Sequence, residues 1–146
     1  MSDSQNKIVQ DLETILSVDQ QSPLCVAFSG GLDSTVLLHA LVQQVTDRPL
    51  RALHINHQLQ DGADDWQAHC RRFCQDHAVS FQAIRVATEA FQDLGIEGAA
   101  RAARYQTFSE NLGRNEWLLT AHHADDQVET MLLALMRGSG ASGLAA

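Results

Sequence analysis

One short segment constrains the fold of this chain more than any other, the glycine-containing stretch SGGLDSTVLLH at residues 29–39. The apolar run Leu24–Phe28 before it predicts a buried strand, whereas residues 34–45 carry apolar side chains at helical spacing. A glycine loop between a strand and a helix binds anions, because backbone N–H groups and the helix dipole point at the bound group. The segment therefore indicates an α/β protein with a phosphate-binding loop.

Strands and helices are predicted to alternate along the chain. This alternation indicates a Rossmann-like α/β fold, in which a parallel sheet is flanked by helices on both faces. Right-handed crossovers then bring the segments Ser29–Ser34, His54–His57 and Ala121–Asp126 together at one edge of the sheet, where ligands bind. Apolar spacing places the other strands at Leu50–Asn56, Val79–Val86 and Trp117–Thr120, and the helices at residues 3–18, 34–45, 63–77, Glu97–Leu112 and Asp125–Arg137.

The length and composition favour one globular domain. The 146 residues are 45% hydrophobic and 19% charged, which suits a single domain over residues 1–146. No segment approaches the roughly 18 apolar residues of a membrane span, and the N-terminus lacks the apolar core of a secretory signal. The three cysteines follow no disulfide pattern, so we expect a cytoplasmic protein. The final stretch RGSGASGLAA is more typical of a connection than of a domain's end, and we expect a fragment of a longer chain.

The net charge of −8 limits how this chain can bind nucleic acid. Extensive contact with a phosphodiester backbone requires clustered positive charge. If the substrate is a nucleic acid, most of the affinity for its backbone must come from elsewhere.

The glycine loop supplies the groups that a phosphate needs. Gly30 and Gly31 allow positive φ and a close approach of the backbone, and Ser34 brings an N–H and a hydroxyl to the start of the helix. Asp33 occupies the position of the lysine in the usual phosphate loop, and an acid beside a polyphosphate requires a cation between them, which suggests Mg²⁺. The alternative is a glycine turn with a helix-capping acid. The expected binding residues are Ser29, Gly30, Gly31, Leu32, Asp33 and Ser34.

Acids and histidines gather in the segment AHHADDQVET, after the fourth predicted strand. On a helix of 3.6 residues per turn, His122, Asp125, Asp126 and Glu129 fall within one arc. Acids gathered at a ligand-binding edge hold a metal or a cationic amine. Two alternatives remain, namely solvated acids in the first turn of a helix and a zinc site in which His122 and His123 join Asp125.

The segment GIEGAARAARY carries a weaker signal. Arg101, Arg104 and Tyr105 are spaced to share one face of a helix, and the two arginines together suit a phosphate or a carboxylate. The alternative is a pair of surface arginines balanced by acids such as Glu97.

The HINH segment ends the second predicted strand. His54 and Asn56 would lie at the edge where an adenine ring can stack, with the backbone placed to read the ring. The alternative is a set of polar groups at the edge of the sheet without a ligand.

The segments SGGLDSTVLLH, HINHQL, GIEGAARAARY and AHHADDQVETMLLALMRGSG, in this order, closely resemble the N-terminal catalytic domain of the tRNA(Ile)-lysidine synthetases. These enzymes belong to the PP-loop family of N-type ATP pyrophosphatases, whose fold is adenine nucleotide alpha hydrolase-like. The resemblance runs from about Pro23 to the end of the chain. Many PP-loop enzymes share SGGxDS, whereas AHHADDQVET and IEGAARAARY are much more specific.

The resemblance implies a two-step, ATP-dependent ligation. ATP adenylates the C2 carbonyl oxygen of the wobble cytidine in tRNA(Ile) with a CAU anticodon, and pyrophosphate leaves. The ε-amine of free L-lysine then displaces AMP and forms lysidine. Full-length relatives grip the tRNA with C-terminal domains, so we expect residues 1–146 to bind ATP without modifying tRNA efficiently.

The resemblance also implies roles for the residues around ATP. The loop Ser29–Ser34 would hold the departing pyrophosphate, and His54 and Asn56 would lie beside the nucleoside. Asp33, with a carboxylate from Asp125 or Asp126, would hold Mg²⁺.

A second group of residues would act on lysine. Asp126 and Glu129 are alternative candidates to hold the lysine amine, and His123 would position or deprotonate it. Arg101 or Arg104 would bind the lysine carboxylate or a phosphate. Together with the residues proposed for Mg²⁺, the expected catalytic set is Asp33, Arg101, Arg104, His123, Asp125, Asp126 and Glu129.

One departure and three rivals qualify this reading. Relatives usually show a glycine and a basic residue after the NH pair, where this chain has Gln58 and Gln60, so the contacts of that turn are left open. Thiolating PP-loop enzymes commonly use CxxC pairs, whereas Cys70 and Cys74 lie four residues apart. Other PP-loop ligases share the loop but not the AHHADDQVET segment. A rival of another class is a nucleotide-binding module without turnover.

Overall fold

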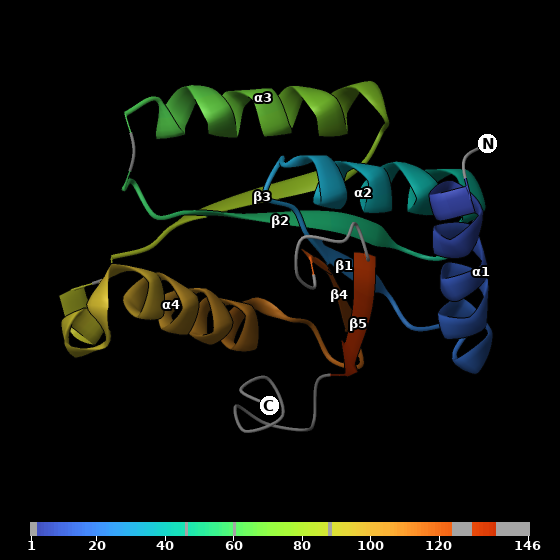
Figure 1. The fold of residues 1–146 in the computed structure, drawn as a ribbon. Helices are drawn as coiled ribbons and strands as arrows, with labels where there is room; N and C mark the ends of the chain where they lie inside the picture. Colours follow the sequence, from blue (N-terminus) through green and yellow to red (C-terminus); the bar gives the residue numbers. More distant parts are fainter. Residues whose placement is uncertain (1–2, 46, 60, 88, 124–129, 137–146) are drawn as a thin grey trace.

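A computed structural model of the chain describes residues 3–45, 47–59, 61–87, 89–123 and 130–136. For residues 3–9, 90–91, 122–123 and 130–136 it describes the backbone alone. A sheet of five strands in the order β3-β2-β1-β4-β5 forms its centre, and helices cover both faces (Figure 1). The elements in chain order are α1 (Asp3–Val18), β1 (Leu24–Ala27), α2 (Leu32–Gln44), β2 (Leu50–Asn56), α3 (Ala63–Asp76), β3 (Ser80–Arg85), the 3-10 helix η1 (Glu89–Leu94), α4 (Gly95–Asn111), β4 (Trp117–His123) and β5 (Thr130–Met136).

Strand β1 is the centre of a parallel sheet. It pairs with β2 on one side and with β4 on the other, and β2 continues the sheet to β3, all in parallel. The predicted α/β fold with a parallel sheet and helices on both faces is therefore confirmed. The strand order reverses at β1, and ligands of such sheets bind at the carboxyl ends of the strands beside that reversal.

The last element differs from the prediction. The helix expected from Asp125 to Arg137 is wrong for residues 130–136, which form β5 antiparallel to β4. His122, expected on a helical arc with three acids, lies in β4 instead. The run TMLLALM is apolar at almost every position, and the periodicity of such a run does not separate a buried strand from a buried helix. The acids Asp125, Asp126 and Glu129 lie outside the described residues.

The strands send alternate side chains into two cores, as expected for a sheet buried on both faces. On one face, Leu24 and Val26 pack against α1, α2 and α3. On the other face, Cys25, Leu53 and Leu118 pack beneath Phe108 of α4. Loops that connect to helices on both sides of the sheet therefore open at the same carboxyl edge. No helix within the described part of the chain is long and apolar enough to cross a membrane.

Candidate functional site

A cavity of about 510 Å³ opens at the carboxyl edge of the parallel strands. The ends of β1, β2 and β4 form its floor, and residues from the segment 57–63 and from α4 form its walls. Its volume lies within the range of roughly 300–1,000 Å³ that is typical of small-molecule pockets. The three segments predicted to meet at this edge each contribute to it, with Ser29 and Ser34, His54 and Asn56, and Ala121.

Hydroxyl groups within the loop after β1 hold it in shape. The Oγ atoms of Ser29 and Ser34 lie 2.9 Å apart in a hydrogen bond, and the Gly31 N–H donates to Ser29 Oγ at 3.2 Å. The Gly31 carbonyl accepts from Thr35 Oγ1 at 2.7 Å. Helix α2 begins at Leu32, so Ser34 lies in its first turn rather than at its first position. The two serine hydroxyls thus lie at the start of α2, and both residues line the cavity. The dipole of α2 favours an anion at this position.

The two glycines of the loop differ in what they require. Gly30 has a φ of +82°, which favours glycine, whereas Gly31 has a φ of −68°, which any residue can adopt. Of the two glycines expected to allow positive φ, Gly30 adopts it and Gly31 does not. Leu32 is 78% exposed and does not line the cavity.

His54 and Asn56 lie at the end of β2, where both line the cavity. His54 Nδ1 lies 2.8 Å from the Phe28 carbonyl oxygen, and because that oxygen only accepts, Nδ1 carries the proton. The Asn56 amide donates to Asp64 Oδ1 at 3.1 Å and to Gln67 Oε1 at 3.0 Å. Its carbonyl oxygen accepts from the Gln58 N–H at 2.9 Å. The Asn56 side chain therefore ties the end of β2 to α3.

Two other residues carry buried polar atoms without a partner among the described residues. These atoms are His57 Nδ1 and Thr120 Oγ1, and both residues line the cavity. Burial lowers the pKa of His57 below its ordinary value of 6.5, and the positive charge of Arg104 and the nearby His54 lower that pKa further. Unpaired polar atoms are costly in an interior, so a ligand that bonds to them gains affinity.

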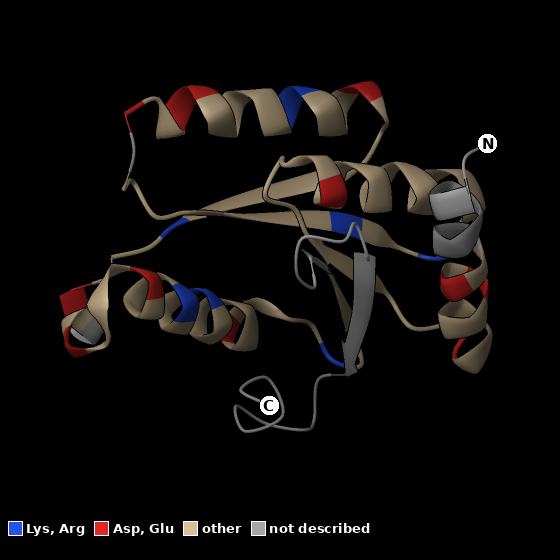
Figure 2. Ribbon diagram, viewed as in Figure 1, with Lys and Arg blue, Asp and Glu red and all other residues tan. Residues whose placement is uncertain are grey.

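The arginines of α4 share a helix face, as predicted. The guanidinium carbons of Arg101 and Arg104 lie 5.3 Å and 5.7 Å from the centre of the Tyr105 ring. Arg104 and Tyr105 line the cavity, whereas Arg101 is exposed and lies outside its lining. Basic residues stand in the middle of α4 while acids mark η1 and the start of α4 (Figure 2). Arg104 is therefore the cation placed to meet an anion in the cavity.

The predicted metal ligands are described only in part. Asp33 lies in the first turn of α2, beside Ser34, and is partly buried. Within the described residues no group of three or more His, Cys, Asp or Glu side chains is arranged to hold a metal. His123 ends β4 but its side chain is not described, and Asp125, Asp126 and Glu129 lie outside the described residues.

Sequence reasoning named His57 and Tyr105 within their segments without giving either a ligand, and it gave Trp66 and Thr120 no role, although all four line the cavity. Thr120 carries a signal, because it is a polar residue at the end of the otherwise apolar run WLLT. Trp66 carries none, since its place depends on how α3 crosses the loop after β1.

Comparison with known families identifies the fold. The PP-loop domain family matches residues 3–146, which is nearly the whole chain. This chain belongs to the PP-loop family. Of the glycine loop at residues 29–34, Ser29 and Ser34 line the cavity. Domains of this family bind ATP.

Curated relatives of this PP-loop domain share a name. Proteins called tRNA(Ile)-lysidine synthase from Yersinia pseudotuberculosis and Escherichia coli O157:H7 are 54% and 55% identical over 83% and 84% of this chain. The protein of the same name from Coxiella burnetii is 46% identical over 92% of this chain. The matched regions cover 28%, 29% and 30% of those relatives, so the chain spans less than a third of their length.

A solved structure confirms the fold of the PP-loop domain. The U34-tRNA thiolase NcsA from Methanococcus maripaludis, determined with its [4Fe-4S] cluster, superposes with a TM-score of 0.56 over 72% of this chain and 40% of its own. The two chains are 15% identical, so the similarity concerns the fold alone.

Proposed function

We propose that this chain is the ATP-binding catalytic domain of a ligase that joins free L-lysine to C2 of the wobble cytidine in tRNA(Ile) with a CAU anticodon. The reaction would pass through an adenylated tRNA, with release of pyrophosphate and AMP. The observation that carries the proposal is the 46–55% identity to three proteins named tRNA(Ile)-lysidine synthase over 83–92% of the chain.

The cavity offers complementary places for the parts of ATP. The hydroxyls of Ser29 and Ser34, with the start of α2, suit the phosphates that leave as pyrophosphate. The apolar floor near Leu53 suits a purine ring, and the unpaired atoms of His57 and Thr120 offer hydrogen bonds to the nucleoside. ATP bound in this way would place its α-phosphate between the loop and α4.

Mg²⁺ fits the loop as a cation shared with phosphate. Asp33 provides one carboxylate beside Ser34, and Mg²⁺ takes one or two carboxylates together with phosphate oxygens rather than a cage of protein ligands. Asp125 or Asp126 would supply the second carboxylate. The bound cation would offset the charge that develops on the pyrophosphate.

The chemistry on lysine would involve the side of the cavity formed by α4 and the end of β4. Arg104 is placed to bind a carboxylate or a phosphate, and Arg101 is the more exposed candidate for the same role. His123 would position or deprotonate the attacking amine, and Asp126 or Glu129 would hold it.

Contact with the body of the tRNA would come largely from outside this chain. With a net charge of −8, the chain lacks the clustered positive charge that extensive backbone binding requires. Residues 1–146 would therefore bind ATP but would not modify tRNA efficiently.

Thiolation of tRNA is the nearest other activity, and the cysteines disfavour it. The sequence holds no CxxC pair. Cys25 lies in the core on one face of the sheet, whereas Cys70 and Cys74 lie in the core on the other face. Burial raises the pKa of Cys25 to about 12 and the pKa of Cys70 and of Cys74 to about 11, so their reactive thiolate forms are scarce at neutral pH.

The deciding experiment is incorporation of labelled lysine into tRNA(Ile) that carries CAU, using the longest form of the protein and ATP. Label is expected in that tRNA and absent from a transcript in which the wobble cytidine is replaced. Substrates for thiolation serve as controls. Transfer of sulfur without incorporation of lysine would overturn the proposal, and robust lysine transfer by residues 1–146 would overturn the dependence on further tRNA contacts.

A further inference from the structure

Helix α3 crosses the phosphate-binding loop and bonds to its first residue. Trp66 Nε1 donates to the Ser29 carbonyl oxygen at 2.8 Å, and Cys70 Sγ lies 3.7 Å from the same oxygen. Trp66 and Cys70 are four residues apart and thus share one face of α3. Two side chains from one helix therefore converge on a single carbonyl of the loop.

The next residue shows how closely the helix approaches. A Cβ atom at Gly30 would lie 2.5 Å from Cys70 Sγ and 3.0 Å from Trp66 Nε1. Only glycine leaves room for these contacts, and the φ of +82° at Gly30 independently favours glycine. The positive φ and the close packing thus both require glycine at the point where the loop contacts α3.

The direction of one peptide plane follows from this contact. The Ser29 carbonyl and the Gly30 N–H belong to the same planar trans peptide, so they point in opposite directions. A peptide that precedes a glycine can rotate at little cost, because glycine populates positive and negative φ about equally. Bonding of the Ser29 carbonyl to α3 selects one of these orientations and thereby fixes where the Gly30 N–H points. N–H groups in such turns are donors to bound anions.

Helix α3 is also tied to the other side of the cavity. Its residues Asp64 and Gln67 accept from the Asn56 amide at the end of β2, as described above. Arg85 at the end of β3 donates to Asp64 at 3.0 Å. One helix thus contacts the ends of neighbouring strands as well as the loop after β1.

We propose that Trp66, supported by Cys70, is a positioning residue that selects the phosphate-binding orientation of the Ser29–Gly30 peptide. This inference deepens the proposed function and rests on it, because it assumes that the loop binds the phosphates of ATP. Trp66 acts through the loop and touches no reacting atom in this scheme. Its effect is therefore on the affinity for phosphate-bearing ligands.

The chain offers a matched control for a test of Trp66. It contains two tryptophans, and Trp117 Nε1 donates to Asp19 Oδ2 at 3.1 Å, at the opposite edge of the sheet. Trp66→Phe and Trp117→Phe therefore remove the same kind of indole N–H···O bond, one at the loop and one far from it. Each keeps an aromatic ring in place, so both variants are expected to fold.

The experiment measures the affinity of both variants and of the wild type for ATP, pyrophosphate and adenosine. Trp66→Phe is expected to bind ATP and pyrophosphate about fivefold more weakly, the size expected for one lost hydrogen bond, with adenosine unchanged. Trp117→Phe is expected to match the wild type for all three ligands. Unchanged ATP and pyrophosphate binding in Trp66→Phe, or an equal loss for adenosine, would overturn the positioning role.

Fluorescence provides a second readout that a purely structural role would not change. In Trp117→Phe, Trp66 is the one remaining tryptophan, and pyrophosphate is expected to alter its emission because the indole bonds to the loop that binds the ligand. Emission that stays constant while pyrophosphate binds would also contradict the inference. If the wild type binds neither ATP nor pyrophosphate, it is the proposed function that fails.

Discussion

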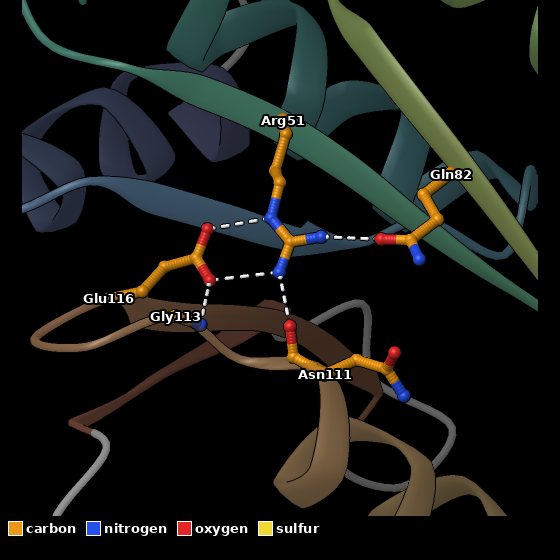
Figure 3. Close-up of polar contacts among 5 residues, drawn as sticks. All are labelled: Arg51, Gln82, Asn111, Gly113 and Glu116. Atoms are coloured by element: carbon orange, nitrogen blue, oxygen red, sulfur yellow. Dashed lines mark hydrogen bonds and ion pairs between the residues drawn. The ribbon is translucent and has the colours of Figure 1, made fainter.

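Arg51 and Glu116 form a bidentate ion pair near the amino-terminal ends of the parallel strands, opposite the cavity (Figure 3). Arg51 Nε and Nη2 donate to the two carboxylate oxygens at 2.7 Å and 2.8 Å, and Nη2 also donates to the Asn111 carbonyl at 2.7 Å. Glu116 in turn accepts from the Gly113 N–H at 2.6 Å. The pair therefore fixes the turn that ends α4, the helix that carries Arg104.

Removal of one partner from this pair is expected to destabilise the fold. Glu116 is 5% exposed, so Glu116→Gln leaves Arg51 partly buried without its countercharge and should lower the free energy of unfolding by about 3 kcal/mol. Gln82 also accepts from Arg51 but is exposed, so Gln82→Ala should change that free energy by less than about 0.5 kcal/mol. Urea titrations of both variants provide the comparison, and equal losses would show that burial of the pair is unimportant.

The two glycines of the loop should respond differently to alanine. Gly30→Ala places a side chain at a φ of +82° and against Cys70, so it should cost about 1–3 kcal/mol of stability. Gly31→Ala should cost less than about 1 kcal/mol, because φ is −68° and the new Cβ would meet only Ser29 Oγ at 3.4 Å. Thermal unfolding of the two variants separates these cases. A larger loss at Gly31 would contradict the loop geometry.

Asp33→Asn tests the proposed cation site. The wild type is expected to bind ATP more tightly when Mg²⁺ is added, whereas the variant should lose most of that gain because its amide is a poorer ligand for Mg²⁺. Calorimetry with and without Mg²⁺ measures the difference, and binding without Mg²⁺ serves as the internal control. An undiminished effect of Mg²⁺ in the variant would remove Asp33 from the site.

His57 should make stability depend on pH. Its pKa in the folded chain lies below 6.5, so the unfolded chain binds protons more readily at His57 than the folded chain does. The contribution of His57 to stability is therefore complete above pH 6.5 and falls as the pH drops through 6.5 towards the folded pKa. His57→Gln cannot titrate, so the difference in unfolding free energy between wild type and variant should shift in favour of the variant between pH 7.5 and pH 5.5. A constant difference would mean that the pKa of His57 is not lowered.

The cysteines should react slowly in the folded chain. With burial and a pKa of about 11 at Cys70 and Cys74, alkylation at pH 8 is expected to be at least about tenfold slower than in urea. Mass spectrometry of the labelled chain, with the unfolded chain as the reference, gives the rate at each site. Rapid labelling of Cys70 in the folded chain would show that α3 leaves the loop readily.

The sequence was sufficient to predict the parallel part of the fold. Strand β2 was placed at Leu50–Asn56 as observed, from the spacing of apolar residues in that segment. The last element was wrong because an apolar run such as TMLLALM carries no period that favours strand or helix. Pairing with β4 determines the conformation of that segment, and pairing is a property of the tertiary structure.

The site was predictable at the level of segments but less so at the level of side chains. The loop, HINH and the segment Ala121–Asp126 were expected to meet, and residues from all three, among them Ala121, line one cavity. Asn56 was expected beside the nucleoside, yet its amide bonds to α3. The contact of Trp66 with Ser29 joins residues 37 positions apart, and no local pattern encodes it.

The crossing of α3 over the loop bears on how such a site can be moved between proteins. A short glycine loop could be expected to keep its structure when transferred to another protein, because it is continuous in sequence and hydrogen bonds within it link its residues. Yet Gly30 leaves room for the side chains of Cys70 and Trp66, which belong to helix α3. A graft of the six residues alone into a foreign strand–helix unit would leave the Ser29 carbonyl without its anchor. The smallest transferable form of the proposed phosphate site is therefore discontinuous, a loop together with the helix that lies across it.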